Sequence, residues 1–138
     1  MSTTIAPQWQ VSSLNGLSHP QVTDYEGQHT LLLFFNLGCL GCMSRGLPLA
    51  NDIARAYPDL NVLGIHSNFG GLPYTREQVQ AEIAKQDLSF PVVMDDKHTT
   101  YDRYQAGGTP HWILLNDKGE IEKSIFGSLP NAQQRLMV

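Results

Sequence analysis

An unbroken apolar run, Leu31 to Phe35, stands shortly before the chain's two cysteines, Cys39 and Cys42. A half-exposed strand would alternate apolar and polar residues, so this run predicts a strand, over 29–36, that is buried on both faces. The segment 43–54 then carries apolar residues at roughly helical spacing. The pattern therefore predicts a buried strand that delivers Cys39 to the start of a helix.

Turn and capping signals divide the rest of the chain into short alternating elements. Gly46 and Pro48 interrupt the helix after the cysteines, because proline lacks a backbone donor and clashes with the preceding turn. We expect a kink there and a second helical piece that ends at 57–58. The further expected elements are a strand over 9–14 turned by Asn15-Gly16, a loop or short edge element over 18–27, a strand over 61–66, a surface loop over 67–74, a helix over 75–86 with a capping box at Thr75, a strand over 91–94, a short helix over 99–104, a strand over 111–116, a hairpin turn over 117–119, a strand over 120–126 and a last helix over 131–138.

Length and charge narrow the class of protein. The chain has 138 residues, enough for a sizeable core, and we expect a single domain over 1–138. A net charge of −4 argues against nucleic acid as the main partner. The first seven residues lack the basic region and apolar core of a signal peptide, and no run approaches the roughly 18 apolar residues of a membrane span. These features predict a cytoplasmic protein without a membrane partner.

The spacing C-x-x-C at a strand-to-helix junction is typical of a redox-active thiol pair. The first turn of a helix has amide protons without partners and a partial positive charge, and both favour a thiolate. With Cys39 at the helix start and Cys42 on the same face, one sulfur would attack a disulfide while the other resolves the mixed species. A bridge between them would close a loop too short to stabilise the fold much. The pair therefore predicts thiol–disulfide exchange.

Several motifs are spread over nearly the whole chain. They are Ala6-Pro7, Asp24-Tyr25-Glu26-Gly27, Cys39 to Cys42, Phe90-Pro91-Val92, and Gly108-Thr109-Pro110 leading into residues 113–119. Through them the sequence resembles the TlpA/ResA-like thiol–disulfide oxidoreductases, which adjoin the AhpC/TSA redoxins. The resemblance implies an α/β, thioredoxin-like fold: a central mixed β-sheet flanked by helices, with an N-terminal β-hairpin extension.

The resemblance also implies roles for individual residues. Cys39 would be the attacking thiol and Cys42 the resolving thiol of the oxidoreductase. Pro110 would be a cis proline that lies against these cysteines, and Thr109 would offer backbone groups to the bound substrate. The expected partners are a protein or small-molecule disulfide or dithiol and an unidentified electron donor or acceptor. No metal and no cofactor are expected.

The sequence departs from that family's pattern around the cysteines. Gly38 stands where the family usually has tryptophan, Leu33 where thioredoxins carry a buried acid, and Arg45 where many members have glutamate. The usual proton relay is therefore missing. A cation at Arg45 would favour the thiolate form of Cys39 and a more oxidising couple, so Arg45 is a candidate for tuning the thiol.

Alternative functions remain open on the sequence. A peroxiredoxin-like peroxide reductase would have threonine or serine three residues before the reactive cysteine, where this chain has Asn36. A Sco-type copper-binding protein uses C-x-x-x-C with a distant histidine, and the spacing here is one residue short. A metal site completed by two of His66, His98 and His111 is a further alternative, although zinc normally takes four ligands and no pair of these histidines has ligand spacing.

Overall fold

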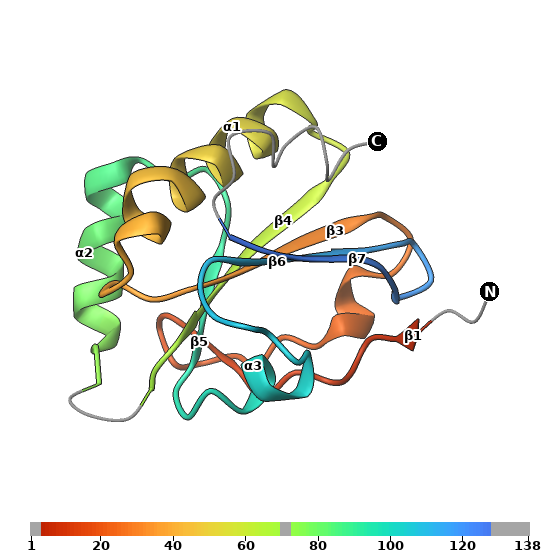
Figure 1. Cartoon of the computed structure of the whole chain (residues 1–138), viewed down its shortest axis with the longest axis horizontal. Helices are drawn as coiled ribbons and strands as arrows, with labels where there is room; N and C mark the ends of the chain where they lie inside the picture. The colour runs from red at the N-terminus through yellow and green to blue at the C-terminus, as the bar shows by residue number, and fades with distance from the viewer. Residues whose placement is uncertain (1–3, 70–72, 128–138) are drawn as a thin grey trace.

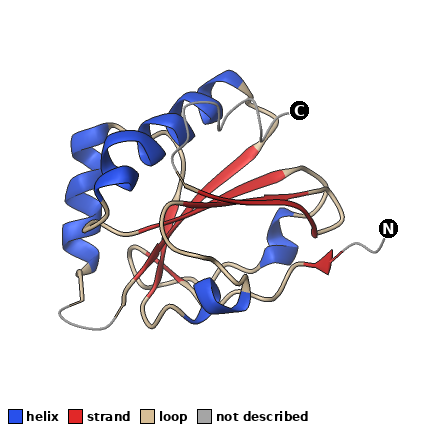
Figure 2. Cartoon of the chain, in the orientation of Figure 1, coloured by secondary structure: helices blue, strands red, loops and turns tan. Residues whose placement is uncertain are grey.

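One mixed β-sheet runs through the computed structural model, which describes residues 4–69 and 73–127 (Figure 1, Figure 2). β3 (Thr30–Phe35) pairs with β4 (Asn61–Ser67), and β4 with β5 (Val92–Asp95), in parallel, whereas all other adjacent pairs of strands in the sheet are antiparallel. The expected α/β class and mixed central sheet are confirmed. In sheet order the strands are β1 (Thr4–Ile5), β7 (Glu120–Phe126), β6 (His111–Leu115), β3 (Thr30–Phe35), β4 (Asn61–Ser67), β5 (Val92–Asp95) and β2 (Ser12–Ser13).

Helices cover both faces of this sheet. α1 (Leu47–Ala56) and α2 (Arg76–Gln86) lie on one face (Figure 1). α3 (Thr99–Arg103) lies on the opposite face, where a 3₁₀ turn at Val22–Tyr25 also packs. The buried apolar residues accordingly form two clusters, one on each side of the sheet.

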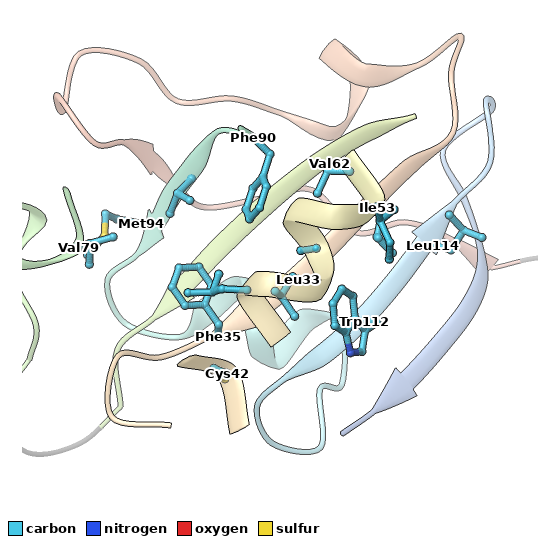
Figure 3. Packing of buried hydrophobic residues seen from close by; sticks show 14 residues of the cluster. Leu33, Phe35, Cys42, Ile53, Val62, Val79, Phe90, Met94, Trp112 and Leu114 are labelled. Atoms are coloured by element: carbon cyan, nitrogen blue, oxygen red, sulfur yellow. The ribbon is translucent and has the colours of Figure 1, made fainter. Parts of the chain in front are cut away.

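The central strand β3 explains the unbroken apolar run of the sequence. All five side chains from Leu31 to Phe35 are at most 1% exposed. Successive side chains of a strand point to opposite faces, so the odd-numbered ones join the cluster under α1, which also contains Cys42 (Figure 3). The even-numbered ones join the cluster around Trp9. The strand predicted over 29–36 is confirmed as Thr30–Phe35.

The N-terminal β-hairpin extension expected from the sequence is wrong in its pairing. The strand expected over 9–14 is reduced to β2, which pairs with β5, whereas β1 pairs with β7 at the opposite edge of the sheet. The turn at Gly16 does form, since its N–H donates to the Ser13 carbonyl at 2.9 Å. The preceding segment is held by a side chain instead: the Trp9 indole donates to Tyr104 Oη at 2.7 Å. The free edges of the sheet therefore determine where β1 and β2 form.

The helix after the cysteines begins at Leu40 and contains the predicted irregularity. Residues Cys42–Gly46 form a π-helical turn, in which the Leu47 N–H bonds to the carbonyl of Cys42, five residues back. Pro48, in the first turn of α1, has no N–H to offer the preceding turn, and the wider π turn accommodates this loss. α1 then ends at Ala56, close to the predicted end.

Local signals locate α2 and the hairpin of β6 and β7 correctly. α2 starts at a capping box: Thr75 Oγ1 accepts from the Gln78 N–H at 3.2 Å, and Gln78 Oε1 accepts from the Thr75 N–H at 2.8 Å. β6 and β7 form the predicted hairpin, in which the Gly119 N–H bonds to the Asn116 carbonyl at 3.1 Å. The last helix expected over 131–138 lies outside the described residues.

Candidate active site

Cys39 lies just beyond the carboxyl end of the central strand β3, in a loop that is held by hydrogen bonds. The Cys39 N–H donates to the Asn36 carbonyl at 3.0 Å. The Asn36 side chain accepts from the Gly38 N–H at 2.8 Å and donates to the carbonyl of Ser67, the last residue of β4, at 2.8 Å. Because β3 and β4 are parallel, their carboxyl ends meet here, and the loop is tied to both strands.

The Cys39 sulfur occupies the capping position of the following helix. The Cys42 N–H donates to Cys39 Sγ at 3.1 Å, and Leu40 is the first helical residue. The sulfur therefore lies beside this amide proton, at the positively polarised end of the helix. Cys39 Sγ also donates to the Thr109 carbonyl at 3.3 Å, and the residue is partly exposed. The predicted placement of Cys39 at a helix start is confirmed.

Cys42 has the opposite environment. Its side chain is fully buried in the cluster under α1 (Figure 3). Burial raises the pKa of Cys42 to about 12, and the hydrogen bond with Cys39 adds to the rise. Cys42 is therefore a protonated thiol at neutral pH. The two cysteines are free thiols in this structure.

The loop that precedes β6 closes the other side of the site. The peptide bond between Thr109 and Pro110 is cis, as the resemblance implied. Because β6 runs antiparallel to β3, the residues before β6 lie at the same edge of the sheet as the cysteine loop. Gly108 has a φ of 143°, which favours glycine. The Phe126 ring also lies against it, and a Cβ at position 108 would be 2.5 Å from that ring. The loop thereby places the Thr109 carbonyl at Cys39.

Gly46 lets the helix approach this proline loop. A Cβ at position 46 would lie 3.3 Å from Pro110 Cβ, which is tighter than an ordinary van der Waals contact. The sequence indicated Gly46 only as an interruption of the helix. Its contact with Pro110 joins segments that are far apart along the chain, so the local pattern contained no signal for it.

Three positions that depart from the family pattern have different surroundings. Arg45 is exposed on the π-helical turn, and its tuning role stays a prediction. Leu33 is fully buried in β3. Gly38 lies against Tyr74, because a Cβ at position 38 would lie 2.9 Å from Tyr74 Oη. A larger residue there would therefore displace Tyr74.

The histidines considered as metal ligands have separate surroundings. His66 is fully buried in β4. His98 Nδ1 lies 2.9 Å from Asp102 Oδ2, and His111 Nε2 lies 2.7 Å from Ser124 Oγ. Within residues 4–69 and 73–127, no group of three or more His, Cys, Asp or Glu side chains is arranged to hold a metal ion.

Two of these histidines contact the site through backbone amides, which the sequence patterns did not indicate. The Leu37 N–H donates to His66 Nε2 at 3.2 Å, so His66 contacts the cysteine loop. The Gly107 N–H donates to His111 Nδ1 at 3.3 Å, so His111 contacts the proline loop. The available signal was position alone, because His66 lies near the carboxyl end of a parallel strand and His111 directly follows the proline.

Comparison with known proteins identifies the family. Residues 3–124 match the AhpC/TSA family, and the chain belongs to it. The chain is 28% identical over 124 residues to the thiol-disulfide oxidoreductase ResA of Geobacillus thermodenitrificans, over 90% of this chain and 68% of that protein. The structure of a thiol-disulfide isomerase from Corynebacterium glutamicum aligns with a TM-score of 0.78 and 26% identity, over 96% of this chain and 93% of that one. With the thioredoxin-like fold and the C-x-x-C pair, these relatives define a thiol–disulfide oxidoreductase.

The cytoplasmic location predicted above is wrong. Relatives of the ResA and DsbE type are extracytoplasmic. One structure of this fold is described as a secreted Mycobacterium tuberculosis disulfide oxidoreductase, with a TM-score of 0.71 and 22% identity over 91% of this chain and 86% of that one. The prediction rested on the residues with which this sequence begins, and these do not determine the compartment. The chain spans 65–68% of the length of three of the curated relatives that it matches.

Among the helices of the described residues, none has the length and apolar character needed to cross a bilayer.

Proposed function

We propose that this protein exchanges electrons with the disulfide bonds of substrate proteins, with Cys39 as the attacking thiol and Cys42 as the resolving thiol. The difference between the two sulfurs carries the proposal. Cys39 Sγ is partly exposed and accepts a helix-end amide proton, whereas Cys42 is sealed in the core. A substrate sulfur therefore reaches Cys39 first.

In the first step, the Cys39 thiolate attacks one sulfur of the substrate disulfide. A bond forms between Cys39 Sγ and that sulfur, the substrate S–S bond breaks, and the second substrate sulfur leaves as a thiolate that takes up a proton. This mixed disulfide joins the protein to its substrate.

In the second step, Cys42 loses its proton and attacks Cys39 Sγ. The mixed disulfide breaks, and the remaining substrate sulfur leaves as a thiolate that takes up a proton. The substrate has then gained two electrons and two protons, and the protein holds a Cys39–Cys42 disulfide. The same steps in reverse oxidise a substrate dithiol, and a second dithiol or disulfide resets the protein.

Thr109 and Pro110 are the proposed docking residues. The Thr109 carbonyl lies 3.3 Å from Cys39 Sγ, so a substrate that reaches the sulfur passes beside this loop. An extended segment that binds to exposed backbone as an added strand gains affinity from main-chain hydrogen bonds, with little sequence choice. Arg45, exposed on the turn that begins with Cys42, would favour the thiolate.

Insulin reduction with dithiothreitol as the electron donor tests this proposal. We expect the protein to accelerate the reduction, and Cys39→Ser to abolish the acceleration. Peroxide consumption and copper titration of the same sample test the two alternative functions. Peroxide turnover or stoichiometric copper binding without insulin reduction would refute the proposal.

A further inference from the structure

Two buried imidazoles hold the two loops that meet at Cys39. His66 and His111 are 0% and 5% exposed. Burial lowers the pKa of both rings, that of His66 to about 4. Both rings are therefore neutral at pH 7, and each has one nitrogen with a free lone pair that accepts a hydrogen bond.

His66 holds the cysteine loop. Its ring packs edge-on against the rings of Phe35 and Tyr74, with ring centroids 5.2 Å and 5.8 Å away. Its Nε2 accepts a hydrogen bond from the Leu37 N–H. Its other nitrogen, Nδ1, is buried without a hydrogen-bond partner in the described part of the chain. An apolar side chain would fill this space without leaving a buried polar atom unpaired. Compared with an apolar side chain, the imidazole therefore adds the hydrogen bond from the N–H of Leu37, which lies two residues before Cys39.

His111 holds the proline loop. Because its Nδ1 accepts from the Gly107 N–H at 3.3 Å, its proton lies on Nε2, which donates to Ser124 Oγ of β7 at 2.7 Å. The ring thereby joins the loop 107–110 to the neighbouring strand. Thr109, whose carbonyl faces Cys39, lies within this loop.

We propose that His66 and His111 are positioning residues for the exchange reaction, each fixing one side of the gap between Cys39 Sγ and the Thr109 carbonyl. This inference rests on the proposed function. His66 fixes the loop that brings the Cys39 sulfur onto the helix end, and so controls the reactivity of that sulfur. His111 fixes the Thr109 backbone, and so controls substrate docking. The two histidines therefore act on different kinetic parameters.

Substitutions that keep or remove the acceptor test the role of His66. Glutamine places an amide oxygen near the Nε2 position of histidine, whereas leucine keeps the bulk without an acceptor. We expect His66→Leu to slow the reaction of Cys39 with the small disulfide 5,5′-dithiobis(2-nitrobenzoate) about fivefold, the effect of one lost hydrogen bond. His66→Gln restores the rate to within about twofold of the wild type.

The expected pattern for His111 is the reverse. His111→Leu raises the KM for insulin about fivefold and changes the rate with the small disulfide less than about twofold. His111→Asn, whose amide oxygen lies near the Nδ1 position, restores the KM. Ser124→Ala tests the strand side of the same link, because it removes the partner of Nε2 and leaves the acceptor for the Gly107 N–H in place. We expect it to raise the KM in the same direction as His111→Leu, by less than about fivefold.

Melting temperatures show which variants fold. A leucine variant that does not fold is replaced by His66→Asn or His111→Gln, in which the acceptor lies at the other position. The proposal is overturned if folded variants without the acceptor react and bind as the wild type does, or if the restoring variants behave like the leucine variants. Neither outcome refutes the proposed function, provided that the wild type reduces insulin and Cys39→Ser does not. Absence of insulin reduction by the wild type refutes the proposed function itself.

Discussion

The regions around the two sulfurs of the C-x-x-C motif differ more than their spacing suggests. Cys39 is partly exposed, and its sulfur contacts the Cys42 N–H and the Thr109 carbonyl. The Cys42 side chain is fully buried one turn later, with a pKa raised to about 12. The motif supplies two equivalent thiols, and the fold makes one of them accessible and keeps the other protonated inside. The following predictions test this difference.

The largest effect is expected at the accessible sulfur. Cys39→Ser removes the sulfur that a substrate reaches first, so insulin reduction should fall to the uncatalysed rate. Mass spectrometry after iodoacetamide treatment at pH 7 gives a second measurement, because the buried Cys42 should stay unmodified in the folded variant. Labelling of Cys42 at the rate of wild-type Cys39 would show that the core does not seal it.

The next effect separates the two steps of the exchange. Cys42→Ser keeps the attacking thiol but removes the resolving one, so turnover should stop after one mixed disulfide has formed. A non-reducing gel should show a covalent adduct between the protein and its substrate, and dithiothreitol should reduce this adduct. Full turnover by Cys42→Ser would mean that Cys42 does not resolve the intermediate.

His66 is buried beneath the cysteine loop, and its titration makes the free energy of unfolding depend on pH. Its folded-state pKa of about 4 lies below its ordinary value of 6.5, so the unfolded chain binds more protons between these values. The stability from neutral His66 is therefore complete above about pH 6.5 and is lost as the pH falls towards 4. The loss is about 1.4 kcal/mol per pH unit, or about 3 kcal/mol over the range.

Urea unfolding at pH 7 and at pH 4.5 measures this loss. His66→Gln is the control, because glutamine does not titrate and should remove the part of the pH dependence that belongs to His66. The same pH dependence in the variant and the wild type would contradict the assignment.

The smallest effect is expected at Arg45, which is exposed on the π-helical turn. Water screens an exposed charge, so Arg45→Glu should slow iodoacetamide labelling of Cys39 only about two- to threefold at low salt, and less at high salt. Rates measured at two ionic strengths check this. An unchanged rate at low salt would remove Arg45 as a tuning residue.

Local signals allowed much of the fold to be predicted. Three features depend only on neighbouring residues, and all of them lie where the sequence predicted them. They are the apolar run that forms β3, the capping box at Thr75 and the start of the helix after Cys39. β1 and β2 have two residues each and depend on distant strands, so the predicted hairpin was wrong. The contacts of Gly46 with Pro110 and of His66 with the cysteine loop also join distant segments, and no local pattern indicates them.

A redox titration tests the central claim most directly. The protein is equilibrated with mixtures of reduced and oxidised glutathione, and the fraction with a Cys39–Cys42 disulfide is measured by acid quenching and mass spectrometry. The expected result is one reversible two-electron transition, with a tenfold change in the ratio of oxidised to reduced protein for about 30 mV. Glutathione adducts on Cys39 without an internal disulfide at any ratio would contradict the claim that the two sulfurs act as a pair.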